Sequence, residues 1–334
     1  MKKYFLLIGF CCLAVFRLNA EASSRIESKS FSNVKEIRFD QVLGDIVVKE
    51  SDSQQTQLEI HYYDGKKKKP DCRISIHNNI LYIRTILPEK RKNEKIKINY
   101  IIAIPRGIAL SVDLEYGNIE INDAFYGDFK AKLAYSELEA KAFVNTQPSI
   151  SCKYGKIEIR SVEDLTLKTE YSEVEIDKAG KLELKSKYTN YRVKTVQTIL
   201  PGSYAKYGVF KIGSINTINI ELDYVDLFID TVEKKMDVKC AYSEVEIKTT
   251  SKQLKDVNLN GSYSDLSIKL HPELSAVFEI DLVYGDLIIS RNHEVKYKVS
   301  EEQNGRIEKK GTIGSKSPSA HIIVSNQYAD VNIK

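Results

Sequence analysis

Carboxylates that recur two residues after a series of tyrosines have the clearest potential for chemistry in this chain. The row comprises Glu137, Glu173, Asp226, Glu244, Asp265 and Asp286. On neighbouring strands these like charges would repel one another, and a bound Ca²⁺ ion would relieve the repulsion. The row is interrupted at Asn118, Lys156, Asn190 and Val209. The glycine- and aspartate-rich nonapeptide of calcium-binding repeats is also missing. We interpret the row as a solvated polar face, with calcium binding as the alternative.

Catalytic motifs are scarce. The histidines are His61, His77, His271, His293 and His321, and no two have the H-x-x-x-H spacing of a metal site. The segment Gly311–Ser317 has the composition of a phosphate-binding loop but lacks its G-x-x-x-x-G-K-[ST] order. No pair of carboxylates is singled out for glycoside cleavage. We therefore expect no catalytic, cofactor-binding or metal-binding residue and no cofactor.

Tyrosines recur at regular intervals and set the frame for the rest of the chain. They are Tyr116, Tyr135, Tyr154, Tyr171, Tyr188, Tyr207, Tyr224, Tyr242, Tyr263 and Tyr284. After Tyr154, apolar or small residues follow at offsets 3, 5, 8, 11, 13 and 15, and Tyr171 arrives at offset 17. The same offsets repeat after Tyr171 and after Tyr207. Longer intervals are interpreted as loops inserted at one corner.

Steps of two residues indicate strands, because alternate side chains share a face. The steps of three between them change parity, so the chain must turn a corner to keep its apolar side chains inward. Each copy is therefore one coil, and stacked coils pair their strands in parallel at ~4.8 Å. The rival, a meander of hairpins, requires Asn-Gly or Asp-Gly turns, and the stretch Tyr154–Val193 has none. The prediction is an all-β parallel β-helix, a β-solenoid of about ten regular coils.

The tyrosine at each corner is expected to point inward, because Tyr171 shares parity with Leu165 and Leu167. A stacked ladder of rings inside the corner is the preferred interpretation, with each hydroxyl reaching water or backbone. A ligand-binding aromatic strip is the alternative.

The termini are expected to differ from the coils. Residues 1–20 read as a signal peptide, with Lys2 and Lys3 before the apolar run Tyr4–Phe16, which is too short to span a membrane. Residues 23–108 should form an N-terminal β cap and first rungs, with Leu43 in a tyrosine's place and a hairpin at residues 78–79. Residues 109–290 are the regular solenoid. Residues 291–334 should add a hairpin at residues 304–305 and a capping rung containing Tyr328.

The net charge limits the class of binding partner, and the cysteine positions limit the possible disulfides. Removing residues 1–20 takes away three basic residues, so 50 basic and 46 acidic residues become 47 and 46, a net charge of +1. This balance argues against nucleic acid. Cys152 and Cys240 each lie two residues before a tyrosine, in an inward position. They are roughly 24 Å apart at the strand spacing, so they should not be bonded to each other. The pairing of Cys72 is open.

Three segments resemble β-helix families of bacterial envelopes that carry the adhesin label, including the head-domain type. They are Val42–Val48, Ile98–Pro105 and the repeated Tyr-Gly/Ser-x-Ile/Val-x-Ile unit of Tyr154–Ile159 and Tyr242–Ile247. The resemblance covers most of the chain after residue 20. It implies a right-handed single-strand β-helix that is exported and has no established enzymatic activity. It carries over no functional residue.

Together these features predict an exported, non-catalytic β-solenoid that binds a macromolecule, either a glycan or an envelope protein. Its expected location is the periplasm or outer surface of a Gram-negative-type bacterium, as a monomer without a transmembrane segment. A polysaccharide-active lyase or hydrolase on a β-helix is the alternative. A pocket with convergent carboxylates at the corner insertions, such as 126–127 or 201–202, would favour the enzyme.

Overall fold

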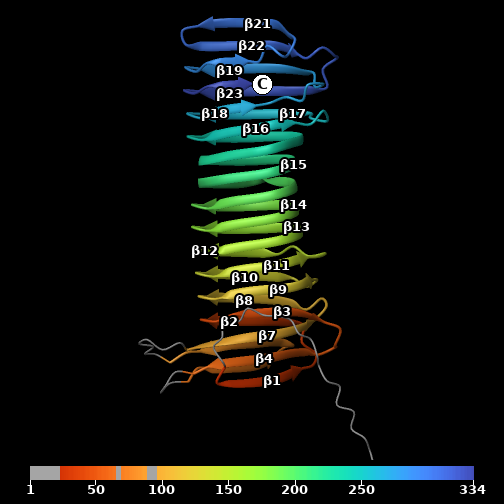
Figure 1. The fold of residues 1–334 in the computed structure, drawn as a ribbon, viewed down its shortest axis with the longest axis vertical. Helices are drawn as coiled ribbons and strands as arrows, with labels where there is room; N and C mark the ends of the chain where they lie inside the picture. Colours follow the sequence, from red (N-terminus) through yellow and green to blue (C-terminus); the bar gives the residue numbers. More distant parts are fainter. Residues whose placement is uncertain (1–22, 65–68, 89–95) are drawn as a thin grey trace, which may run out of the picture.

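The chain folds as one tall stack of β-strands in the computed structural model, which describes residues 23–64, 69–88 and 96–334 (Figure 1). No helix occurs in these ranges. Consequently, none of the described segments is an apolar helix long enough to cross a bilayer. The expected signal peptide, residues 1–20, lies outside the described residues.

The middle of the stack shows why the repeat folds as it does. Its strands are β10 (Phe129–Ala134), β11 (Glu137–Phe143), β12 (Ser149–Lys153), β13 (Lys156–Glu170), β14 (Glu173–Lys187), β15 (Asn190–Ala241), β16 (Glu244–Thr250), β17 (Asp256–Ser262) and β18 (Asp265–Ile268). β13 pairs in parallel with β14, and β14 with β15. Ile159, Ile176 and Val193 lie directly above one another, and all three are buried. Equivalent template positions therefore stack, and the prediction of a parallel β-solenoid is confirmed.

The N-terminal end is closed by antiparallel strands. It comprises β1 (Arg25–Phe31), β2 (Glu36–Val42), β3 (Ile46–Ser51), β4 (Thr56–Tyr63), β5 (Asp71–His77), β6 (Ile80–Ile86), β7 (Lys97–Pro105), β8 (Ala109–Glu115) and β9 (Asn118–Phe125). β2 and β3 pair in parallel with β8 and β9 above and with β6 and β7 below. β5, β4 and β1 then add antiparallel edges. The β5–β6 hairpin turns at Asn78 and Asn79, whose φ angles are 52° and 64°, as predicted.

The C-terminal end holds a rearrangement that the spacing did not reveal. Its strands are β19 (Ala276–Val283), β20 (Leu287–Ile289), β21 (Val295–Gln303), β22 (Arg306–Ile313), β23 (Ala320–Gln327) and β24 (Val331–Ile333). β23 lies between β17 and β19, and β24 lies between β18 and β20. The predicted hairpin at Asn304–Gly305 is present, and β22 pairs with β19 antiparallel. The end of the chain therefore lies inside the stack rather than at its tip (Figure 1).

This order corrects the expectation that the Tyr284 rung follows the Tyr263 rung directly and that the Tyr328 rung comes last. The rung containing Tyr328 sits between the other two. The β21–β22 hairpin covers the outer edge of β19, so the returning chain pairs on the opposite edge. There β23 gains parallel partners on both sides, β17 and β19.

Cys152 and Cys240 are buried in the single core, and both are free thiols, as is Cys72. Burial raises the pKa of the Cys240 thiol to about 11 and raises that of Cys152 in the same direction. Both therefore behave as small hydrophobic side chains.

Ile176 and Glu175 provide a matched test of the inward and outward assignment. Ile176 is 1% exposed in the core, so Ile176→Asp should lower the free energy of unfolding by about 4 kcal/mol or more, because it buries a charge. Glu175 instead pairs with Arg192 at 2.9 Å on the surface, so Glu175→Gln should cost less than ~1 kcal/mol. Urea unfolding monitored by circular dichroism measures both. Equal losses would contradict the assignment.

Candidate functional site

Each corner tyrosine adopts a left-handed backbone conformation. The φ angles of the ten predicted tyrosines and of Tyr328 lie between 51° and 60°. Leu43 has φ 59° and thus occupies the equivalent position in the opening rung. For a residue other than glycine this conformation costs roughly 1–2 kcal/mol, and Asn or Gly would ordinarily be preferred. Something other than backbone preference therefore keeps tyrosine at this position.

The rings point outward, which corrects the expectation that they lie inside the corner. They are 40–61% exposed, whereas Thr169, two residues before Tyr171, and Ser172, directly after it, are buried. Parity predicts an inward ring only where extended backbone continues through the tyrosine. A single left-handed residue instead swaps the faces of the chain. The side chain at that residue turns out of the coil, and the next side chain turns in.

The exposed rings form one continuous stack. In spatial order it runs Tyr116, Tyr135, Tyr154, Tyr171, Tyr188, Tyr207, Tyr224, Tyr242, Tyr263, Tyr328 and Tyr284. Neighbouring centroids are 4.6–5.4 Å apart, and the planes are inclined by 2–19°. We call this surface the tyrosine stripe. Each pair contributes about 0.5–1.5 kcal/mol beyond area burial, which is similar to the cost of the left-handed corner.

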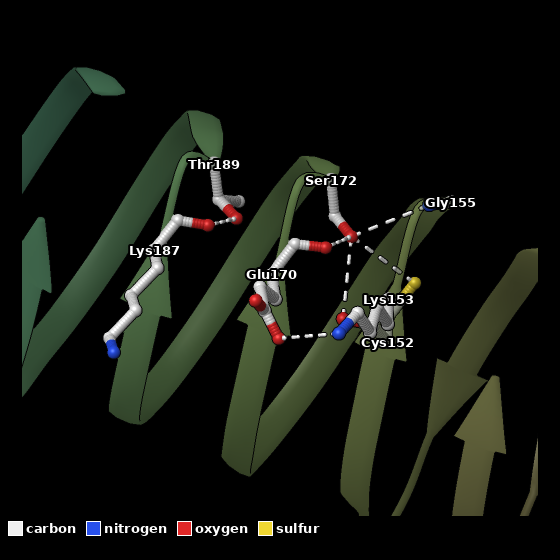
Figure 2. Close-up of polar contacts among 7 residues, drawn as sticks. All are labelled: Cys152, Lys153, Gly155, Glu170, Ser172, Lys187 and Thr189. Atoms are coloured by element: carbon white, nitrogen blue, oxygen red, sulfur yellow. Dashed lines mark hydrogen bonds and ion pairs between the residues drawn. The ribbon is translucent and has the colours of Figure 1, made fainter. Parts of the chain in front are cut away.

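Short polar side chains form hydrogen bonds to the backbone of the corner beneath the stripe (Figure 2). The Ser172 hydroxyl donates to the Glu170 carbonyl at 2.9 Å and accepts from the Gly155 N–H of the preceding rung at 3.4 Å. The Thr189 hydroxyl likewise donates to the Lys187 carbonyl at 2.9 Å. Lys153 and Glu170 form an ion pair at 3.2 Å across the same two rungs. These bonds hold the backbone in the turn that projects each ring.

The acidic row lies beside the stripe, and its short members bond to backbone. Asp226 Oδ1 accepts from the Glu244 N–H at 3.1 Å, and Asp265 Oδ1 accepts from the Asp330 N–H at 3.3 Å. Asp330 in turn accepts from the Asp286 N–H at 2.9 Å. Within the described ranges no three His, Cys, Asp or Glu residues are grouped to hold a metal ion. These contacts give the Asp226 and Asp265 carboxylates a structural role.

A groove with a volume of about 860 Å³, which the sequence reasoning missed, crosses the strand face that leads into the stripe. We call it the basic groove. Its charged lining residues are Arg38, Asp40, Arg73, Arg84, Asp113, Lys130, Lys132, Lys168, Glu183 and Lys185, with His77 beside them. Hydroxyl groups line it at Ser75, Ser111, Ser149, Ser151 and Thr166, and Tyr82 adds an aromatic ring. By contrast, the corner insertion at residues 126–127 borders a cavity of only about 10 Å³.

The groove is built from outward side chains that stack in two columns. One column includes Ser111, Lys130, Ser149 and Thr166 in successive strand pairs. The other includes Asp113, Lys132, Ser151, Lys168 and Lys185. The repeat of the sequence predicts that Lys168 and Lys185 lie one above the other, since each lies 14 residues after a tyrosine of the stripe. The insertions before Ser149 hid the alignment of the remaining members.

Comparison with known proteins assigns the chain to a family. Residues 34–334 match the model described as Toastrack DUF4097. The chain belongs to the Toastrack DUF4097 family. Among curated proteins nothing matches. Family membership confirms the resemblance seen in the repeated unit, and it agrees with the solenoid-like architecture of this Toastrack chain.

Three solved structures are similar at low identity. One, described as a putative cell adhesion protein from Clostridium sporogenes, is 9% identical with a TM-score of 0.21, covering 93% of this chain and 98% of its own. A putative adhesin from Parabacteroides merdae is 11% identical with a TM-score of 0.37, covering 75% and 98%. A putative adhesin from Bacteroides fragilis is 16% identical with a TM-score of 0.25, covering 75% and 98%.

Tyr188 tests whether stacking stabilises the stripe. Its ring lies 4.6 Å from both Tyr171 and Tyr207. Tyr188→Ala removes two stacked pairs while keeping the left-handed corner, so the free energy of unfolding should fall by about 1–3 kcal/mol. Tyr188→Phe keeps both pairs and should stay within ~0.5 kcal/mol of wild type. Chemical denaturation measures both variants. An alanine variant as stable as wild type would show that stacking does not hold the rings in place.

Proposed function

We propose that this protein is an exported, non-catalytic β-solenoid that binds a macromolecule of the cell envelope or of a surface it meets, in the manner of an adhesin. The proposed organisation is a signal peptide at 1–20, an N-terminal cap with first rungs at 23–108, a regular solenoid at 109–290 and a C-terminal capping rung and hairpin at 291–334. The proposed coil is right-handed, with about ten regular turns. Membership of the Toastrack family supports the solenoid-like fold in this proposal.

The tyrosine stripe is the observation that carries the proposal. Eleven rings, each 40–61% exposed, extend for about 48 Å at the ~4.8 Å strand spacing. Contiguous exposed apolar surface of this size marks interaction sites. Tyrosine is enriched in such sites because a rigid ring supplies contact area at a low entropic cost. Because neighbouring rings already stack, little further ordering is needed on binding.

The shape of the stripe favours a macromolecular partner over a small ligand. A flat, open row of rings cannot enclose a small molecule, whose sites are concave and bury most of the ligand. An extended glycan or a protein surface can contact several rings at once. We place the protein in the periplasm or on the outer surface of a Gram-negative-type bacterium, as a monomer. A role as a polysaccharide lyase or hydrolase is the competing function.

Ring removal within the stripe tests the proposal. Asn tolerates a left-handed backbone, so the triple variant Tyr171→Asn, Tyr188→Asn, Tyr207→Asn should keep the coil while removing three rings. The matched control carries Phe at the same three positions and keeps the rings. Wild type, at residues 21–334, should bind members of an array of immobilised neutral glycans and envelope proteins. The Asn variant should lose at least tenfold in affinity for them, and the Phe variant should match wild type.

Two results would contradict the proposal. One is a folded Asn variant that binds as tightly as wild type. The other is release of soluble sugar fragments from bound glycans by wild-type protein, which would indicate the enzyme instead. Circular dichroism verifies that each variant is folded.

A further inference from the structure

We propose that the basic groove binds a linear anionic polysaccharide, one that carries carboxylate or sulfate groups along its length. This inference rests on the binding role proposed above but assigns it a second surface, distinct from the tyrosine stripe. The groove lies on the strands that lead into the stripe. Lys132, Lys168 and Lys185 each lie three residues before a stripe tyrosine.

Charge is concentrated in the groove. Its lining has seven arginine and lysine side chains and three carboxylates, an excess of four positive charges. The chain without residues 1–20 has an excess of only one. A local excess of this size on a nearly neutral protein indicates an anionic ligand rather than a generally basic surface.

Several of these cations lack a counter-ion. Arg84 pairs with Asp40 at 2.5 Å, and Arg38 pairs with Glu36 outside the groove. In contrast, no ion pair within the described ranges involves Arg73, Lys130, Lys132, Lys168 or Lys185. Lys168 and Lys185 lie opposite each other in adjacent parallel strands, where like charges destabilise the sheet. A bound anion would relieve this repulsion.

The lining hydroxyls point to a sugar as the bearer of the charge. Ser111, Ser149, Ser151 and Thr166 line the groove in adjacent strands, and within the described chain their hydroxyls form no hydrogen bond that would occupy them. Each can both donate to and accept from a sugar hydroxyl. Single-stranded nucleic acid would instead require a series of stacking rings. The groove offers one ring, Tyr82, with the Arg38 guanidinium 5.6 Å from its centroid.

The extent of the groove indicates a polymer. Its lining comes from β5, β6, β2, β8, β10, β12, β13 and β14 in spatial order. Seven strand-to-strand steps of ~4.8 Å give a length of about 34 Å. A chain of several sugars lying across the strands fits this length, and its repeated acidic groups would meet cations on several rungs.

Charge reversal within the groove provides the test. The groove variant is Lys132→Glu, Lys168→Glu, Lys185→Glu. The matched control reverses three exposed lysines elsewhere, Lys141→Glu, Lys178→Glu, Lys211→Glu, and therefore has the same net charge. Binding of residues 21–334 to polygalacturonate, heparin, neutral dextran and poly-dT is measured by calorimetry at 50 and 200 mM salt. Thermal melting verifies that both variants fold.

We expect wild type to bind polygalacturonate or heparin, more weakly at high salt, and not to bind dextran. The groove variant should lose at least tenfold in affinity, and the control should stay within twofold of wild type. Equal losses in both variants would show a non-specific charge effect and overturn the assignment. So would the absence of binding to both anionic glycans, or equally tight binding of poly-dT. The stripe variant with Asn at residues 171, 188 and 207 should keep its affinity for these glycans, so failure of the groove and failure of the stripe are distinguishable.

Discussion

The left-handed residue at the tyrosine corner of each rung is the constraint on which the rest of the structure depends. A coil of parallel strands must keep apolar side chains inside while the chain changes direction, and an extended backbone continued through the tyrosine would turn the next side chain outward. One residue with φ near 55° exchanges the two faces of the chain. Thr169 and Ser172 are three residues apart and would point to opposite faces of an extended chain, but with Tyr171 between them both are buried. The same residue must project its own side chain outward. The exposed stripe is therefore a geometric consequence of a closed, dry core.

The two ends obey the same need to satisfy backbone groups. A parallel stack presents an open row of N–H and C=O groups at each end, which would recruit other chains. Here β1, β4 and β5 close one end and the β21–β22 hairpin closes the other, all in antiparallel register. Antiparallel strands can return along the edge through a two-residue turn such as Asn304–Gly305, whereas a further parallel rung would need a long crossover connection.

Much of the fold could be predicted from the sequence, because burial in a strand leaves a period of two and a corner leaves a period of three. The strands around Ile157 and Ile176, both hairpins and the buried thiols follow from these patterns. The outward direction of the rings could not be predicted in this way, because counting alternate residues assumes one backbone conformation throughout. The position of Tyr328 between Tyr263 and Tyr284 could not be predicted either. Every rung shares one template, so the pattern does not specify which rung pairs with which.

The basic groove was hidden for a related reason. Its lining residues are as distant in sequence as Arg73 and Lys185, and only the register of the rungs brings them together. A solenoid repeats each outward position at ~4.8 Å, so residues at one offset form a column along the stack. Weak contacts made on successive rungs then add along a single ligand, because the first contact raises the effective concentration for the next. A surface built from repeats accordingly selects ligands that are themselves repetitive, and this favours polymers over compact molecules for both the groove and the stripe.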